Sequence, residues 1–243
     1  MTLSAKDIKL IKSLSQKKFR EETGLFVVEG EKLVNEALAS SFRVVRVIRK
    51  DDVGEAQMAR ISSLSTPPPV LALVQQPSDL SCAPLPGRGL YLALDGIRDP
   101  GNLGTILRIA DWFGLDGVYA SPDTVELFNP KVVQATMGAI FRVPFHCTDI
   151  PTLCRSVDGA VYGTFLDGEN IYAGELSCGD SAPSLIVMGN EANGISPAVA
   201  AGVTRRLYIP PYPPDDPGSE SLNVAVATAI TVAEFRRRCF DNH

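Results

Sequence analysis

Histidine is scarce in this chain, and the residue patterns that mark several common chemistries are missing. The 243 residues contain two histidines, His146 and His243, which leaves almost no material for a histidine-based metal site or catalytic triad. The five cysteines lie far apart and include no Cys-x-x-Cys pair, so the sequence predicts neither a disulfide framework nor a zinc site. We therefore expect no bound metal, and a reducing cytoplasm as the compartment.

Long apolar runs are missing as well. No segment has the roughly 20 successive apolar residues that cross a bilayer, and the N-terminus has no apolar signal-peptide core, so neither membrane insertion nor secretion is predicted. The net charge of −5 argues against a surface that binds polyanions everywhere. The first twenty residues differ, because they carry six lysines and arginines against Asp7 alone. They are either a contact surface for RNA or the solvated face of an amphipathic helix.

The order of apolar segments predicts two α/β domains. Ile8, Ile11 and Leu14 recur at the helical period, and residues 25–29, 31–40, 43–48 and 70–74 have the patterns of a strand, a helix and two strands. We expect a small α/β domain over residues 1–80, followed by a linker rich in proline and glycine. From residue 90 to 243, apolar strands alternate with loops and helices, which predicts a mostly parallel sheet. Ligands of such sheets bind in loops beyond the carboxyl ends of the strands.

The first candidate loop runs from Asp95 to Arg108. Gly101 and Gly104 permit a close backbone approach, and Asn102 is expected to cap the helix that follows, with Arg108 in the second turn. The glycine offsets differ from the dinucleotide fingerprint, and no acidic residue stands where a ribose would be held, so a nicotinamide cofactor is disfavoured. Taken alone, the loop also fits an ordinary capped turn between a strand and a helix.

Two later loops follow apolar strands. Gly189 ends the first of these strands, and because glycine has no side chain, the flat ring of a ligand can lie against the backbone there. A helix start with Glu191 in its first turn explains the pattern equally well. The second strand, near residues 206–209, leads into a proline-rich loop and then a helix, about residues 222–238, that Ser219 or Ser221 is expected to cap. Free amides at a helix start can bind a carboxylate or phosphate.

The three loops share one order, Asn-x-Gly-x-x-x-Arg, then Gly-x-Glu-x-x-Gly, then Ile-Pro followed by Ser-Leu-Asn-Val-x-Val-Ala. In this order they resemble the SpoU/TrmH family of RNA 2′-O-ribose methyltransferases. The resemblance covers Leu90 to about Arg238, and residues 26–34 are similar to the family's small substrate-recognition domain. It implies methyl transfer from S-adenosylmethionine (AdoMet) to RNA, a homodimer, and a deep trefoil knot in the C-terminal domain. General topology rules alone would have predicted an unknotted sheet.

The resemblance also implies roles for particular residues. Three residues correspond to AdoMet contacts, and they are Gly189, Ile209 and Leu222. Five correspond to the catalytic and substrate-positioning set, and they are Asn102, Arg108, Glu191, Ser221 and Asn223. The family assigns removal of the hydroxyl proton to the arginine, but guanidinium stays protonated in proteins and is a poor base, so binding of an RNA phosphate is the easier role for Arg108. The loop between Ile209 and Ser221 is longer than is usual in the family.

Three alternative functions remain open at this point. A related knotted enzyme that methylates a base nitrogen is disfavoured by the motif from Asn102 to Arg108. A non-catalytic RNA-binding module is opposed by the presence of the whole catalytic set. A Rossmann-type oxidoreductase fits only the order of strands and helices. Among RNA substrates, the separate N-terminal domain and the absence of a basic tail favour ribosomal RNA over transfer RNA.

Overall fold

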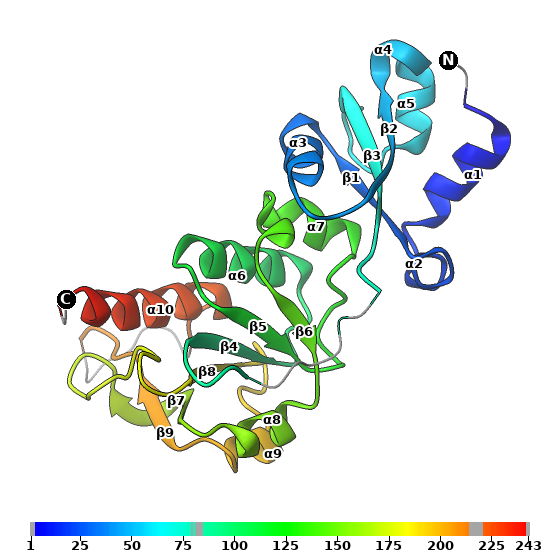
Figure 1. The fold of residues 1–243 in the computed structure, drawn as a ribbon. Helices are drawn as coiled ribbons and strands as arrows, with labels where there is room; N and C mark the ends of the chain where they lie inside the picture. Colours follow the sequence, from blue (N-terminus) through cyan, green and yellow to red (C-terminus); the bar gives the residue numbers. More distant parts are fainter. Residues whose placement is uncertain (1–2, 79, 81–84, 214–220, 242–243) are drawn as a thin grey trace. The chain divides into compact units, whose positions relative to one another are not determined.

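The computed structural model describes residues 3–78, 80, 85–213 and 221–241 (Figure 1). The chain divides into two compact units. The first unit combines Met1–Asp79 with the later segment Glu126–Arg142, and the second combines Leu80–Val125 with Val143–His243. The expected domains, residues 1–80 and 90–243, stay a prediction. No helix among the described residues is both long enough and apolar enough to cross a membrane.

The first unit is built on an antiparallel three-stranded sheet in the order β1-β3-β2. Its elements are α1 (Ala5–Ser13), α2 (Lys17–Thr23), β1 (Leu25–Glu29), α3 (Glu31–Ala39), β2 (Val44–Arg49), α4 (Lys50–Val53), α5 (Glu55–Ile61), β3 (Val70–Gln75), α7 (Pro130–Thr136) and a 3₁₀ turn at Ala139–Phe141. Ser4 caps α1 through a capping box with Asp7. Ile8, Ile11 and Leu14 are buried, so the predicted amphipathic helix is confirmed.

The segment Glu126–Arg142 completes the core of the first unit. Phe128 lies against Phe26 with ring centroids 4.6 Å apart, and Phe141 meets Phe42 edge-on at 5.2 Å. Arg20, which is 2% exposed, forms an ion pair with Glu126. A buried charge is costly without a partner, so Arg20 requires Glu126. This ion pair and the aromatic contacts attach Glu126–Arg142 to residues about a hundred positions earlier in the sequence.

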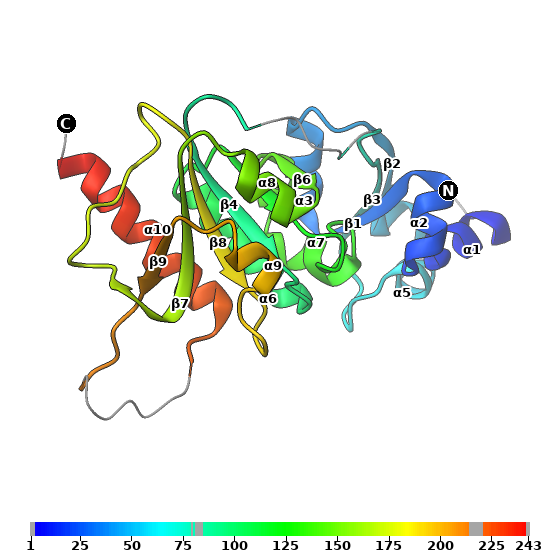
Figure 2. The same ribbon diagram turned by 90° about the horizontal axis from the view of Figure 1, so that it is seen from below.

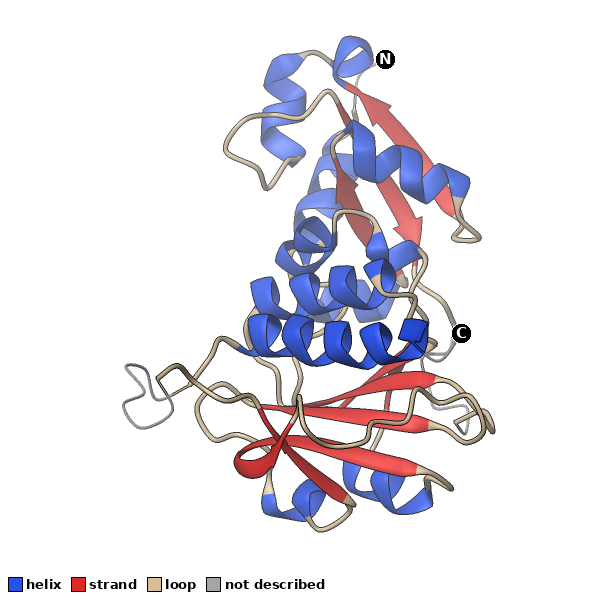
Figure 3. Cartoon of the chain, turned by 90° about the vertical axis from the view of Figure 1, so that its left-hand side faces the viewer, coloured by secondary structure: helices blue, strands red, loops and turns tan. Residues whose placement is uncertain are grey.

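The second unit is built on a six-stranded parallel sheet in the order β6-β5-β4-β8-β7-β9. Its elements are β4 (Leu90–Asp95), α6 (Pro100–Trp112), β5 (Gly117–Ala120), β6 (Phe145–Cys147), α8 (Ile150–Ser156), β7 (Ala160–Asn170), β8 (Ser184–Gly189), α9 (Pro197–Ala200), β9 (Arg205–Tyr208) and α10 (Val224–Asp241). The predicted parallel α/β sheet is confirmed. Helices cover both of its faces: α6 and α10 lie on one, and α8 and α9 on the other (Figures 2 and 3).

The cysteines contradict one expectation from the sequence. Cys178 and Cys239 form a disulfide, with Cα atoms 5.9 Å apart, although 61 positions separate them in the chain. The loop after β7 packs on the end of α10, and spacing along the sequence carries no information about that contact. Of the remaining described cysteines, Cys147 is exposed and Cys154 is buried, both as free thiols. Cys82 lies outside the described residues.

Candidate functional site

Three loops meet at one edge of the parallel sheet. They follow β4, β8 and β9, and β4 pairs with β8 so that Asp95 lies opposite Gly189. The Asp95 carboxylate accepts a hydrogen bond from the Ser196 backbone amide at 2.7 Å, and the Asn190 side chain donates to the Gly96 carbonyl at 2.6 Å. These bonds fasten the loop after β8 to the loop after β4. The candidate site therefore rests on a rigid strand edge, where ligands of parallel sheets bind.

Helix α6 begins three residues earlier than the sequence predicts. Asp99 is the cap, because its side chain accepts from the Asn102 amide at 2.8 Å, and Pro100 occupies the first helical position. The expectation that Asn102 caps this helix is wrong, and Arg108 lies in the third turn instead of the second. Asp-Pro is a typical helix start, and this signal was present in the sequence. The cap frees the Asn102 side chain for other contacts.

A chain of hydrogen bonds joins all three loops through the Asn102 side chain. Asn223 donates from its amide nitrogen to Asn102 Oδ1 at 3.0 Å, and Asn102 donates from Nδ2 to Glu191 Oε1 at 2.8 Å. A carboxylate can only accept here, so Glu191 fixes which way the Asn102 amide points. The structure thus brings together three of the five predicted catalytic residues, from positions far apart in the chain.

Asn223 also begins the last helix. Its Oδ1 accepts from the Ala225 amide at 2.9 Å and from the Val226 amide at 3.3 Å. The prediction that Ser221 caps α10 is therefore wrong, and Ser219 lies outside the described residues. Ser221 is exposed, and its hydroxyl has no hydrogen bond to a described residue, which leaves it available to a ligand. Asn223 thus combines two functions that the sequence did not separate, the helix cap and the orientation of Asn102.

Arg108 is exposed on α6, and its guanidinium makes no hydrogen bond or ion pair with a described residue. It lies six residues after Asn102, which corresponds to about 9 Å along a helix axis. Long side chains on a helix lean toward its N-terminus, which is the end of α6 that borders the three loops. Since guanidinium is always charged, a free arginine near this edge suits a phosphate.

Gly189 is required by the fold of its own loop. A Cβ atom at this position would lie 2.2 Å from the Gly194 carbonyl carbon and 2.3 Å from the Ile195 nitrogen. Asn190 and Gly194 bridge each other, and Gly194 has a φ of +66°, so Glu191 stands in a tight turn and not in the first turn of a helix. The alternative reading of this loop as a helix start is therefore wrong.

The residues expected to contact AdoMet follow the strands that border the site. Gly189 ends β8, Ile209 follows β9 directly, and Leu222 stands two residues before α10. Ile209 is half-buried and Leu222 is 49% exposed, so both offer apolar surface of the kind that covers an adenine ring. The exposed carboxylate of Glu191 suits a positively charged donor. These residues fit AdoMet in chemical type. No group of side chains among the described residues could hold a metal ion.

Comparison with known proteins identifies both parts of the chain. Residues 89–233 match the model of the SpoU rRNA methylase family, and residues 5–64 match the MRM3-like substrate binding domain. The chain is 32% identical over 243 residues to the 23S rRNA (guanosine(2553)-2′-O)-methyltransferase RlmP of Bacillus subtilis, covering 93% of this chain and 94% of that protein.

Solved structures agree with this assignment. A TrmH-family protein from Porphyromonas gingivalis is 38% identical, with a TM-score of 0.86 over 98% of this chain and 100% of that one. An AdoMet-bound rRNA methyltransferase from Sinorhizobium meliloti is 31% identical, with a TM-score of 0.85 over 98% of this chain and 97% of that one. The sequence motifs, the parallel sheet and these matches agree, and the chain belongs to the SpoU rRNA methylase family.

Proposed function

We propose that this protein transfers the methyl group of AdoMet to a ribose 2′-hydroxyl of ribosomal RNA. The observation that carries the proposal is the hydrogen-bond chain from Asn223 through Asn102 to Glu191, at the carboxyl ends of the strands. Arg108 on α6 makes no hydrogen bond or ion pair with a described residue, which is consistent with a role in binding RNA. The family match and the 2′-O-methyltransferase RlmP, which is similar along almost its whole length, support the same activity. The match of residues 5–64 to a substrate binding domain supports an RNA substrate for the first unit.

The reaction is an in-line displacement at a methyl carbon. A bond forms between the ribose 2′-oxygen and the methyl carbon, the bond from that carbon to sulfur breaks with its electron pair left on sulfur, and the hydroxyl proton passes to solvent water. AdoMet supplies the activated methyl group, and Gly189, Ile209 and Leu222 would hold it. No metal is needed. The protein contributes alignment of the 2′-oxygen with the methyl carbon, which alone is worth several orders of magnitude in rate.

The polar side chains have distinct roles in this scheme. Arg108 binds the RNA phosphate beside the target ribose and stabilises charge that develops on the 2′-oxygen. Asn102 and Ser221 position the ribose, and Asn223 and Glu191 hold Asn102 in one orientation. The 2′-hydroxyl is the atom group that separates RNA from DNA, so DNA is not a substrate.

We further propose the deep trefoil knot for the second unit and a homodimer for the whole protein. Support for the knot comes from α10, which packs beside α6 while Asn223 at its start bonds to Asn102. Support for the dimer comes from large apolar side chains left exposed on these two helices: Trp112 is 83% exposed and Val226 is 48% exposed. Light scattering should give twice 26.1 kDa, and Trp112→Glu should shift the protein toward the monomer. A wild-type monomer at micromolar concentration would contradict the dimer.

The activity is tested with purified protein, AdoMet and ribosomal RNA from cells that lack this protein. The expected product carries one new 2′-O-methyl group, found by mapping resistance to alkaline cleavage, and a substrate with a 2′-deoxyribose at that nucleotide should not react. A methyl group on a base nitrogen would instead show that the protein acts as the related knotted enzymes do. AdoMet binding without any methylated product would favour a non-catalytic module.

A further inference from the structure

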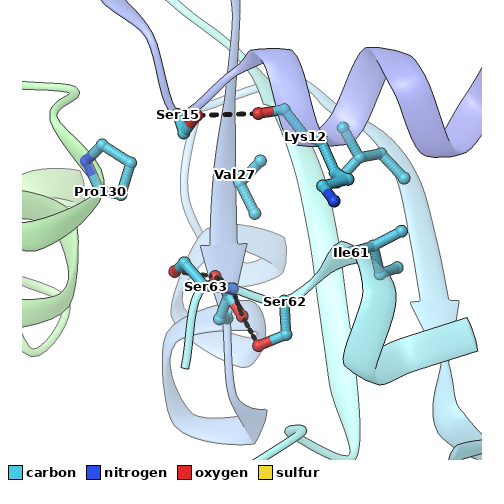
Figure 4. Close-up of a pocket in the computed structure, with 9 residues that line it drawn as sticks. Lys12, Ser15, Val27, Ile61, Ser62, Ser63 and Pro130 are labelled. Carbon is cyan, nitrogen blue, oxygen red and sulfur yellow. Dashed lines mark hydrogen bonds between the residues drawn. The ribbon is translucent and has the colours of Figure 1, made fainter. Parts of the chain in front are cut away.

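The first unit contains a cavity that the methyl-transfer site does not use. It has a volume of about 150 Å³ and lies between α1, β1 and the residues that follow α5, with Pro130 on a further side (Figure 4). All but one of its lining residues belong to the segment that matches a substrate binding domain, residues 5–64. The chemistry of the walls indicates what this cavity can hold.

The polar wall is organised around a buried carboxylate. Glu29 is 6% exposed, and it accepts hydrogen bonds from the Ser62 hydroxyl, the Ser63 hydroxyl and the Ser63 backbone amide, the last at 3.0 Å. These three donors satisfy the carboxylate, so it serves to hold the serines in place. Its negative charge nevertheless makes the interior unfavourable for a phosphate. Because this charge disfavours an anion and already has its hydrogen-bond donors, the wall suits a neutral occupant whose polar atoms can meet the serine hydroxyls.

The other walls are apolar. Ile11 and Ile61 are almost fully buried, and Val27 of β1 forms the floor between them. Aliphatic walls with a few fixed hydroxyl groups suit a flat heterocycle, which has apolar faces and hydrogen-bonding edges. A nucleobase has this chemistry.

A cation stands at the same cavity. Lys12 lines it from the exposed side of α1, and its ammonium makes no ion pair with a described residue. Figure 4 shows the Lys12 side chain reaching from α1 toward Ile61 and Ser62. Lys12 also belongs to the basic stretch of the first twenty residues, in a chain whose net charge is −5. A cavity whose carboxylate disfavours an anion inside, with a free lysine at its edge, fits a neutral base with its phosphate outside.

We propose that this cavity receives one unstacked base of the ribosomal RNA substrate, while Lys12 binds the phosphate beside that base. The proposal rests on the proposed function and states what the first unit selects, namely RNA with an unpaired, turned-out nucleotide. Sequence-specific recognition of RNA mostly targets such nucleotides, because bases inside a duplex cannot be reached. The contact is a binding contact, so it affects affinity for RNA and leaves the transfer step unchanged.

Lys9 provides the matched control, because it is exposed on the same helix and does not line the cavity. Lys12→Ala should weaken binding of ribosomal RNA from cells lacking this protein by about tenfold, a typical effect of one lost charged contact, and Lys9→Ala by less than about twofold. On a fully paired RNA duplex the two variants should bind alike. Equal losses on ribosomal RNA would show that only general electrostatic attraction acts here, and would overturn the proposal.

A second variant tests the cavity itself. Ser15 is exposed at its edge, and Ser15→Phe places a ring in the space without changing charge. We expect the KM for ribosomal RNA to rise while kcat at saturating RNA and the affinity for AdoMet stay unchanged. If the Ser15→Phe protein is folded and binds ribosomal RNA with normal affinity, the proposal that a base enters the cavity is overturned. If the wild-type protein binds this RNA but does not methylate it, the proposed function fails and the comparison of binding remains valid.

Discussion

At the scale of single residues, Arg108 offers a direct test of the proposed chemistry. Arg108→Ala removes both the charge and the planar fork, so turnover should fall by about two orders of magnitude, a size typical of one lost transition-state contact. Arg108→Lys keeps the charge but not the bidentate geometry, and it should recover less than about tenfold. Single-turnover methylation measures both effects, and calorimetry should show AdoMet affinity unchanged.

Arg155 is a suitable control for this experiment, because it is exposed on α8, on the opposite face of the sheet from α6. Arg155→Ala should leave turnover unchanged. Arg108→Ala should stay folded, because an exposed arginine without partners contributes little to stability. Near wild-type turnover in this variant would therefore remove Arg108 from the proposed site.

The two roles of Asn223 can be separated by two substitutions. Asn223→Asp keeps an oxygen that accepts from the amides at the start of α10, so the melting temperature should stay close to that of the wild type. The new carboxylate cannot donate to Asn102 Oδ1, and Glu191 already binds the nitrogen of the same amide. Asn102 therefore loses its fixed orientation, and turnover should fall at least about tenfold. Asn223→Ala loses the donor and the cap, and it should also cost about 0.5–2 kcal/mol of stability.

Thermal unfolding and single-turnover assays on both Asn223 variants distinguish these effects. Full activity in a stable Asn223→Asp protein would show that the bond to Asn102 does not matter for turnover.

The sequence predicted the members of this residue set better than their contacts. Asn102, Glu191 and Asn223 were named from their order in the motifs, and the structure joins them. The capping roles were assigned wrongly, because Asp99 competes with Asn102 for the start of α6 and Asn223 competes with Ser221 for the start of α10. Several good capping residues stand close together at both helix starts, and only the backbone geometry selects one.

At the scale of elements, α10 depends on a carboxylate near its end. Glu234 is 7% exposed and accepts hydrogen bonds from Arg237 and Arg238. The Arg237 hydrogen bond, together with that of Arg238 and both positive charges, lowers the pKa of Glu234 from 4.5 to about 2 despite burial. Arg238 also donates to the Ile171 carbonyl at 2.8 Å, so the same cluster holds the loop after β7.

This lowered pKa predicts how stability depends on pH. The charged form of Glu234 stabilises the folded protein above about pH 4.5, and this contribution is lost as the pH falls toward 2. Glu234→Gln should therefore lower the melting temperature at pH 7, and its deficit relative to the wild type should shrink between pH 4.5 and pH 3. Glu175→Gln, at an exposed position of the same unit, is the control. A deficit that does not change with pH would contradict the role of this charge.

The elements themselves follow well from local patterns. The strand expected at residues 25–29 is β1 with the same bounds, and the strand expected at 70–74 is β3 with one residue more. Short continuous runs of apolar residues determine these segments locally. The disulfide between Cys178 and Cys239 was missed, because it depends on which loop reaches α10 and not on any nearby pattern.

At the scale of the whole molecule, no local pattern indicated that Glu126–Arg142 belongs to the first unit. Phe128, Val132 and Phe141 are buried, as apolar residues of either unit would be. Periodicity tells which side chains are buried but not which core they enter. The match to the family model runs over residues 89–233 without a break. It therefore also gives no sign that residues 126–142 belong to the first unit.

A fragment experiment tests this grouping. Residues 1–79 alone should not fold cooperatively, because Arg20 loses its ion pair with Glu126 and Phe26 loses its contact with Phe128. A synthetic peptide of residues 126–142 should restore a cooperative transition, measured by circular dichroism, and a peptide with Phe128→Ser and Phe141→Ser should not. A fragment 1–79 that folds without the peptide would contradict this.

The same late segment sets an order of events during translation. Phe26 leaves the ribosome about a hundred residues before Phe128, which at about 5–20 residues per second corresponds to about 5–20 s. For that time the nascent N-terminal unit has its three strands but lacks a wall of its core, and its apolar surface stays open to chaperones or to wrong partners. The N-terminal unit is therefore completed only after Leu80–Val125, about a third of the second unit, has been synthesised.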